Sequence, residues 1–196
     1  MSVITARGVE KRYGRKRALR ALDLELPRGS FLLVTGPNGS GKTTLLRLIA
    51  GLAAPSSGEL HVDLDRGRLG YLGHEPLLYR DLTAQENLDL YGRLYRVSER
   101  GARIAALLDQ FGLSAVRSER TGSFSRGMIQ RLALCRVLLH EPDLLVLDEP
   151  FTALDAEGAD LLDRQLAELA SVDTVVLTTH DPARVAHLAT DRLALT

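Results

Sequence analysis

Short apolar runs alternate along this chain with segments in which apolar residues recur every three or four positions. The apolar runs lie at Phe31–Thr35, Leu69–Leu72, Leu144–Leu147 and Thr174–Thr178. Runs of four or five residues without polar interruption are typical of strands that are covered on both faces. The helical patterns between them lie at Leu45–Ala50, Ile129–Leu139 and Asp160–Ala170. Because buried strands alternate with helices, the pattern predicts an α/β fold with a mainly parallel sheet.

Residues 74–131 interrupt this alternation, because the strand signal disappears and only helical patterns remain. Thr83 and Glu86 have the spacing of a capping box at the start of the first helix. Gly112 stands where a glycine commonly ends a helix, after the second pattern. We therefore expect one domain over residues 1–196, with a core of residues 1–73 and 132–196 and a helical insertion at 74–131.

Composition narrows the class of protein. Apolar residues make up 45% and charged residues 26% of the chain, as in a soluble globular domain. No apolar run approaches the roughly 18 residues of a membrane span, and Met1–Thr5 begins no signal peptide. The 25 basic and 25 acidic residues cancel, so we expect no nucleic-acid partner. Cys135 is the only cysteine, which excludes an internal disulfide, fits a reducing cytoplasm and, in its apolar surroundings, indicates a buried, inert thiol.

The most specific motif is GPNGSGKTT, which matches G-x-x-x-x-G-K-[ST] between a predicted strand and a predicted helix. Glycines let successive backbone N–H groups turn toward phosphate, and the helix start adds its positive dipole end. Lys42 would contact the β- and γ-phosphates and Thr43 would bind Mg²⁺. The alternative, a chance glycine-rich turn, does not explain the flanking strand and helix. The expected nucleotide-binding residues are Gly36, Pro37, Asn38, Gly39, Ser40, Gly41, Lys42, Thr43 and Thr44.

Two further strands end in residues suited to phosphate chemistry. In LLVLDEP an apolar run is followed by Asp148 and Glu149. Asp148 would hold Mg²⁺ through water, and Glu149 would act as the general base. TTHD brings His180 to the end of another strand, where it can contact the γ-phosphate and position water. Alone, these would read as an ordinary solvated turn and a surface histidine; beside a P-loop, the catalytic interpretation is favoured. The other histidines with no such pattern are His61, His140 and His187.

The segment FSRGMIQR begins a long helical pattern. Ser125 is a good N-cap, and Gly127 leaves room beside the backbone at the helix start. A hydroxyl at a helix N-terminus is a candidate second anion site, although on its own the pattern predicts only a capped helix.

Taken in order, GPNGSGKTT, FSRGMIQR, LLVLDEP, TALD and TTHD resemble the nucleotide-binding domain of ABC ATPases over essentially the whole chain. The resemblance implies a P-loop NTPase (RecA-like) core with an antiparallel β part on the N-terminal side and an inserted helical subdomain that ends in the signature loop. It implies Mg²⁺ with ATP as the cofactor, and a homodimer or paired cassette in which each ATP meets the partner's signature loop. The residues that it assigns are Ser125, Arg126, Gly127 and Met128 in the signature loop, Asp155 in the D-loop, and Tyr13 stacked on adenine.

Three positions depart from the family pattern. Arg126 and Met128 replace a glycine and a glutamine of the signature loop, and His74 replaces the Q-loop glutamine that contacts Mg²⁺. The histidine leaves metal contact and coupling to a membrane partner open. LGHEP, LTAQENLDLYGRLY, FTALD and the short chain resemble the ATP-binding subunits of cytochrome c maturation haem exporters, in which this histidine is usual. A haem-ligand role for His74 is the less favoured alternative.

The resemblance thus predicts an ATP-hydrolysing transporter subunit that dimerises around Mg-ATP and drives a separate transmembrane permease. It would be cytoplasmic and peripheral on the inner face of the cell membrane, with haem export as the finer prediction. The alternatives are transport of another substrate, a soluble ABC ATPase such as the iron–sulfur assembly type, and a regulator that binds nucleotide without hydrolysis. A basic cluster reads as a solvated hairpin, or else as a contact with anionic lipid or a partner; its members are Lys11, Arg12, Arg15, Lys16, Arg17 and Arg20.

Overall fold

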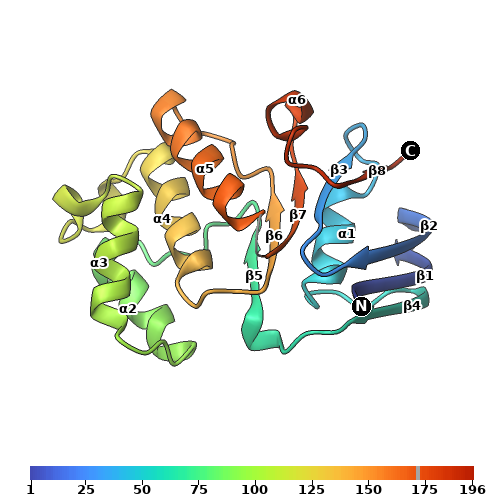
Figure 1. Ribbon diagram of the computed structural model, residues 1–196, viewed down its shortest axis with the longest axis horizontal. Coiled ribbons are helices and arrows are strands. Elements are labelled where there is room, and N and C mark those ends of the chain that lie inside the picture. Colours follow the sequence, from blue (N-terminus) through green and yellow to red (C-terminus); the bar gives the residue numbers. More distant parts are fainter. Residues whose placement is uncertain (171–172) are drawn as a thin grey trace.

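Two sheets organise the chain in the computed structural model, which describes residues 1–170 and 173–196 (Figure 1). The antiparallel sheet has the order β2-β1-β4. Its strands are β1 (Ser2–Tyr13), β2 (Lys16–Pro27) and β4 (Ser57–Val62). The larger sheet has the order β5-β6-β7-β3-β8, and each neighbouring pair in it is parallel. Its strands are β3 (Phe31–Thr35), β5 (Leu69–Leu72), β6 (Leu144–Asp148), β7 (Thr174–Thr178) and β8 (Asp191–Ala194).

The helices form layers on both sides of the parallel sheet (Figure 1). They are α1 (Lys42–Ile49), α2 (Ala84–Leu94), α3 (Arg100–Gln110), α4 (Arg126–Leu138), α5 (Ala156–Leu169) and α6 (Pro182–Val185). Short 3₁₀ segments lie at Arg66–Arg68, Ser114–Val116 and Thr121–Ser123. The helices α4 and α5 cover one face, with α2 and α3 beyond them, whereas α1 and the antiparallel sheet cover the other.

Side chains of the central strands sort alternately into two hydrophobic cores. Leu145 and Leu147 of β6 pack into the core on the α4 and α5 side. Leu144 and Val146 of the same strand pack into the core shared with α1 and the antiparallel sheet. Burial on both faces explains why these strands read as continuous apolar runs rather than alternating ones.

The four strands expected from apolar runs are present within one residue of the expected bounds, so the predicted α/β fold is confirmed. The antiparallel part on the N-terminal side is confirmed as well. The edge strand β8 was not expected, because its residues alternate between exposed and half-buried positions and include two charges. The capping box is also present: Glu86 N–H donates to Thr83 Oγ1 at 3.1 Å, and Thr83 N–H donates to Glu86 Oε2 at 2.8 Å. Gly112 follows the end of α3 with φ +65°, as expected.

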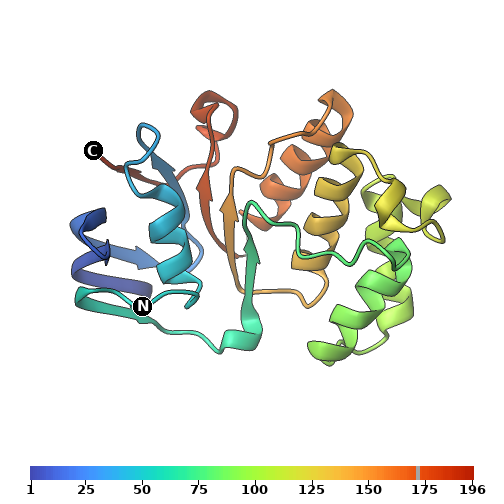
Figure 2. The ribbon, with the colours of Figure 1, turned by 180° about the vertical axis from the view of Figure 1, so that it is seen from behind.

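The segment from residue 73 to residue 83 leaves β5 and crosses to α2 (Figure 2). Helix α4 begins at Arg126, inside the expected insertion, and continues to Leu138 in the core. The proposed division at residue 131 therefore falls within one continuous helix, and the partition into core and insertion stays a proposal.

Cys135 is fully buried in α4, and burial raises the pKa of its thiol well above the usual range, as expected of an inert core cysteine. Within the described part of the chain, no helix combines the length and the apolar character needed to cross a bilayer.

Candidate functional site

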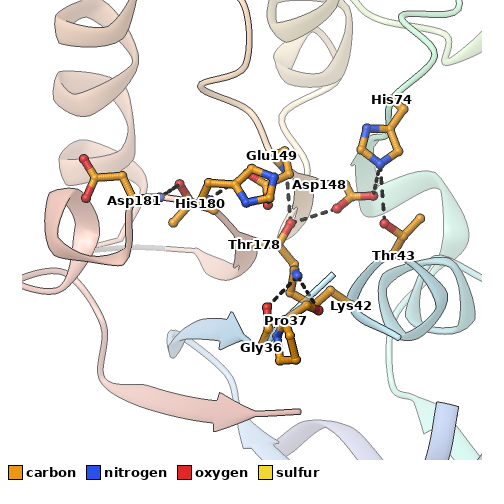
Figure 3. A network of polar contacts seen from close by, with 11 residues as sticks. Gly36, Pro37, Lys42, Thr43, His74, Asp148, Glu149, Thr178, His180 and Asp181 are labelled. Atoms are coloured by element: carbon orange, nitrogen blue, oxygen red, sulfur yellow. Dashed lines mark hydrogen bonds and ion pairs between the residues drawn. The ribbon is translucent and has the colours of Figure 1, made fainter. Parts of the chain in front are cut away.

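Three segments meet at the carboxyl edge of the parallel sheet. The loop of residues 36–41 follows β3, Asp148 and Glu149 end and follow β6, and residues 178–181 end and follow β7. Because β6, β7 and β3 are consecutive neighbours, their carboxyl ends bring these segments together (Figure 3). Open α/β sheets bind ligands at this edge.

The loop after β3 depends on its glycines. Gly36 has φ +144° and Gly41 has φ +103°, backbone conformations that residues with a side chain rarely adopt. A Cβ atom would lie 2.5 Å from the Leu195 carbonyl oxygen at Gly36, and 2.5 Å from that of Ala18 at Gly41. Gly41 is the N-cap of α1 and brings no side chain, so the first N–H groups of the helix remain available for an anion.

Lys42 curls back over this loop. Its Nζ donates to the Gly36 carbonyl at 2.7 Å and to the Pro37 carbonyl at 3.2 Å (Figure 3). The buried Ser40 Oγ has no hydrogen-bond partner among the described residues. The other expected contacts, Asn38, Gly39 and Thr44, lie in the same loop or the first turn of α1. The loop thus combines a cation, unpaired N–H groups and a hydroxyl, which suits a polyphosphate.

Asp148 and Glu149 share one hydroxyl group. Asp148, which is 3% exposed, accepts a hydrogen bond from Thr178 Oγ1 to its Oδ1 at 2.8 Å. The Glu149 N–H donates to the same Thr178 Oγ1 at 3.0 Å. Thr178 therefore fixes the side chain of one acid and the backbone of the next. Sequence reasoning assigned no role to Thr178, although a hydroxyl at the end of an apolar strand was a usable signal.

Glu149 faces His180. Its Oε2 accepts the His180 backbone N–H at 2.9 Å, and its Oε1 lies 3.4 Å from His180 Nε2. Oε1 is buried, and the described chain supplies it with no hydrogen bond. Glu149 also has φ +53°, a conformation that costs a non-glycine residue about 1–3 kcal/mol and is most frequent at functional sites. A carboxylate oxygen with a free lone pair can accept a proton from water.

The residues at the ends of β5 and β6 fit a divalent cation. Asp148 Oδ2 is buried, and none of the described residues donates a hydrogen bond to it. His74 Nε2 lies 3.5 Å from this oxygen and 3.5 Å from Thr43 Oγ1 (Figure 3). The expected metal residues Thr43 and Asp148 are therefore brought together with His74.

The expected signature residues lie at the start of α4. Ser125 caps this helix by accepting the Met128 N–H at 3.2 Å, as expected. A Cβ atom at Gly127 would lie 3.1 Å from the Ala153 carbonyl oxygen, so the glycine allows close approach. Arg126 is exposed and lines a pocket of about 240 Å³ whose other walls include His74, Asp148 and Glu149.

Two other expected residues lie outside the phosphate cluster. Asp155 caps α5 by accepting the Gly158 N–H at 2.9 Å, a structural role that the sequence reasoning did not include. Tyr13 lies at the turn between β1 and β2, about half exposed, with Lys11 Nζ 5.0 Å from its ring centroid. Five of the six basic residues of the cluster are exposed, in keeping with a solvated hairpin, whereas Lys11 is half-buried and donates to the Ala54 carbonyl at 2.6 Å.

A buried arginine links the helices to the segment that carries His74. Arg136 of α4 donates to the Tyr71 carbonyl at 3.1 Å and lies 5.3 Å from the centroid of the Tyr91 ring. The Tyr91 hydroxyl donates to the Leu77 carbonyl at 2.5 Å. Burial lowers the pKa of Arg136. Residues 71 and 77, on either side of His74, are thus both held, which no pattern in the sequence predicted.

Comparison with known proteins places the chain in a family. Residues 19–152 match the profile of the ABC transporter family. The chain is 39% identical over 206 residues to the daunorubicin resistance ATP-binding protein DrrA3 of Streptomyces coeruleorubidus, covering 99% of this chain and 65% of that protein. It is 38% identical to the cytochrome c biogenesis ATP-binding export protein CcmA of Salmonella typhi, covering 99% and 97%.

Solved structures agree. An ATP-binding subunit of an ABC transporter superposes with a TM-score of 0.90 at 27% identity, covering 99% of this chain and 86% of that one. A dimeric ATP-binding cassette in a post-hydrolysis state, bound to ADP and Pi, superposes with a TM-score of 0.88 at 29% identity, covering 98% and 94%. The chain therefore belongs to the ABC transporter family, as one of its ATP-binding domains.

Proposed function

We propose that this chain hydrolyses ATP as the catalytic subunit of an ABC transporter, at the cytoplasmic, inner face of the cell membrane. The observation that carries the proposal is the buried Glu149 carboxylate oxygen, which has no hydrogen bond within the described residues and faces His180. A buried carboxylate without its hydrogen bonds is costly, and such groups are characteristic of active sites.

Each group of site residues has a separate role in the proposed hydrolysis. The loop of residues 36–41 and Lys42 hold the phosphates, and the Glu149 Oε1 accepts the proton of the attacking water. His180 lies beside that oxygen, where it positions the water and contacts the γ-phosphate. Thr43 and Asp148 would hold Mg²⁺, which neutralises charge on the phosphates when bound.

We infer that two such domains, identical or homologous, act together around Mg-ATP. The dimeric neighbour bound to ADP and Pi supports this arrangement. Ser125 and Arg126 are exposed at the start of α4, where they remain accessible to the nucleotide of a facing domain. In that arrangement the signature loop acts on the partner's ATP, Asp155 lies near the interface, and Tyr13 stacks on adenine.

An exposed apolar region supports a separate permease as partner. Leu52, Leu77 and Tyr79 are each at least half exposed, and apolar side chains gathered on one surface are typical of interaction sites. A groove of about 390 Å³ between α1 and the segment after β5 is lined by Leu52, His74 and Leu77, among others. An apolar helix of a transmembrane permease would fit this groove, directly beside the phosphate site.

Haem export is the finer proposal. It is supported by His74 in LGHEP, because a histidine in this loop is usual in the haem-exporter subunits that the chain resembles. The cytochrome c biogenesis relative is matched over 97% of its length and the drug-resistance relative over 65% of its length, at nearly equal identity. The chain spans 60–62% of three other relatives, two of which are Nod factor export proteins of similar identity. Because relatives of similar identity are named for different exported compounds, the substrate has to be established by identifying the permease partner.

Hydrolysis is tested with three single variants of the purified chain. Glu149→Gln should bind Mg-ATP but hydrolyse it at least about 100-fold more slowly, because the base is lost. Lys42→Ala should lose nucleotide binding. Glu59→Gln, on the exposed surface of β4, is the matched control and should hydrolyse like the wild type. Hydrolysis by Glu149→Gln at the wild-type rate would refute the assignment of the base.

The partner is tested by purifying tagged Glu149→Gln chain with Mg-ATP from detergent-solubilised membranes of its host. A multi-spanning protein retained only with ATP supports the transporter, and a haem-exporter permease supports the finer proposal. Recovery of soluble assembly factors alone would contradict both and favour a soluble ABC ATPase.

A further inference from the structure

His74 lies between two oxygen atoms that suit a metal ion. It follows β5 by two residues, and its Nε2 is 3.5 Å from Thr43 Oγ1 and 3.5 Å from Asp148 Oδ2 (Figure 3). Both distances exceed the 2.7–3.2 Å typical of an N–H···O hydrogen bond. His74 Nε2 therefore faces both oxygens without being closely bonded to either.

The distance from His74 Nε2 to each oxygen is that of two ligands on one ion. Two ligands about 2.1 Å from a cation lie about 3.0 Å apart at a right angle and about 3.4 Å apart at the tetrahedral angle. The observed 3.5 Å separations are close to these values. Asp148 Oδ2 is buried and receives no hydrogen bond from the described chain, so a cation bound to it directly, rather than through the water expected from the sequence, would satisfy it.

The His74 imidazole belongs to a segment, residues 71–77, that is hydrogen-bonded at both ends. The Arg136 guanidinium binds the Tyr71 carbonyl before His74, and the Tyr91 hydroxyl binds the Leu77 carbonyl after it. The side chain of His74 itself remains 65% exposed toward the groove. In the tautomer that carries its proton on Nδ1, the imidazole offers the Nε2 lone pair to a metal.

We propose that His74 Nε2 is a direct metal ligand that makes the cation site of this chain select Mn²⁺ or Co²⁺ over Mg²⁺ in the nucleotide complex. The inference rests on the proposed function, because it concerns the same phosphate site. Carboxylate, hydroxyl and water oxygens suit Mg²⁺, whereas imidazole nitrogen suits transition metals, whose affinities rise from Mn²⁺ to Co²⁺. A nitrogen ligand beside Thr43 and Asp148 thus shifts the preferred metal.

The direct test is the electron spin echo of Mn²⁺ with ADP bound to the full chain. ADP avoids turnover, and histidine labelled with ¹⁵N distinguishes a histidine nitrogen from backbone or lysine nitrogen. We expect nuclear modulation from histidine nitrogen in the wild type, its loss in His74→Gln, and its retention in His61→Gln, whose exposed histidine lies on β4. Bound Mn-ADP without histidine modulation in the wild type would overturn the proposal.

A binding measurement separates metal choice from loop placement. We expect His74→Gln to weaken ADP binding with Mn²⁺ or Co²⁺ by at least about 10-fold. Removing a residue that only orients a metal ligand already lowers metal affinity about 10-fold or more, so the loss of a ligand itself should cost at least as much. ADP binding with Mg²⁺ should weaken less, so the ratio of the ADP affinity with Mn²⁺ or Co²⁺ to that with Mg²⁺ should be smaller in His74→Gln than in the wild type. Equal weakening with Mg²⁺ and Mn²⁺ would mean that His74 only positions the loop, and would refute metal selection.

The same titrations distinguish this inference from the proposed function. The proposed nucleotide site predicts that the wild type binds ADP with Mg²⁺ and that Lys42→Ala does not, whatever the role of His74. If that binding is present and the metal preference of His74→Gln equals that of the wild type, only the His74 inference fails. If the wild type binds no nucleotide with any metal, the proposed function fails as well.

Discussion

Replacement of Thr178 by valine removes one hydroxyl group and almost preserves the shape of the side chain. Thr178 is completely buried at the end of β7. Its Oγ1 donates to Asp148 Oδ1 at 2.8 Å and accepts the Glu149 N–H at 3.0 Å. The substitution therefore removes a hydroxyl group that is hydrogen-bonded to both acidic residues, without opening a cavity.

The expected loss of stability follows from these two hydrogen bonds. A hydrogen bond to a charged group contributes about 1.5–3 kcal/mol, which applies to Asp148. The Glu149 N–H can still donate to the Thr178 carbonyl, which lies at 3.2 Å. Loss of its hydrogen bond to Oγ1 should therefore cost only about 0.5–1 kcal/mol. We expect Thr178→Val to lower the free energy of unfolding by about 2–4 kcal/mol. For a domain of this size that corresponds to a decrease in Tm of about 4–16 °C.

Thr178→Ser is the matched control, because it keeps the hydroxyl and loses only a methyl group, worth about 1 kcal/mol. Urea unfolding followed by circular dichroism gives the free energies, and ATP hydrolysis by the same preparations gives the activity. Thr178→Val should hydrolyse ATP much more slowly than Thr178→Ser, because Asp148 and Glu149 lose their common support. Equal stability and activity of the two variants would show that the hydroxyl does not organise the site.

Three smaller predictions test other contacts. Cys135 should resist thiol reagents in the folded protein at pH 8, because burial raises its pKa, and should react at the rate of global unfolding; rapid labelling of folded protein would contradict this. The hydrogen bond from Arg68 lowers the pKa of Asp143, so its stabilisation is present above the unfolded carboxyl pKa of about 3.9 and is lost as the pH falls through the lower folded pKa. Arg68→Met should therefore destabilise the protein by less than about 1 kcal/mol at pH 7 and by progressively less as the pH is lowered below about 3.9, as measured by chemical denaturation at each pH; an effect that does not decrease with pH would exclude the ion pair as the cause. Tyr91→Phe should cost about 1 kcal/mol or less, because the half-exposed Leu77 can bond water instead, yet it should accelerate hydrogen exchange in residues 73–79; unchanged exchange there would show that the tyrosine does not hold this segment.

Features set by near neighbours in the chain were readable from the sequence. The P-loop, the capping box of Thr83 and Glu86, and the N-cap Ser125 each depend on residues a few positions apart. The central strands were equally clear, since burial on both faces leaves an uninterrupted apolar run. The antiparallel strands and β8 have exposed positions between buried ones, so their individual bounds did not stand out.

The contacts that complete the site depend on tertiary structure. Strand order β6-β7-β3 brings Thr178 against Asp148 and Glu149, although 29 or 30 residues separate them along the chain. Packing of β5 beside β6 brings His74 to the oxygens of Asp148 and Thr43. Strand order is decided by how all the buried faces pack at once. The local pattern around His74 therefore showed only a departure from the family, whereas its three-dimensional neighbours, Asp148 and Thr43, are the observation behind the proposed metal-ligand role.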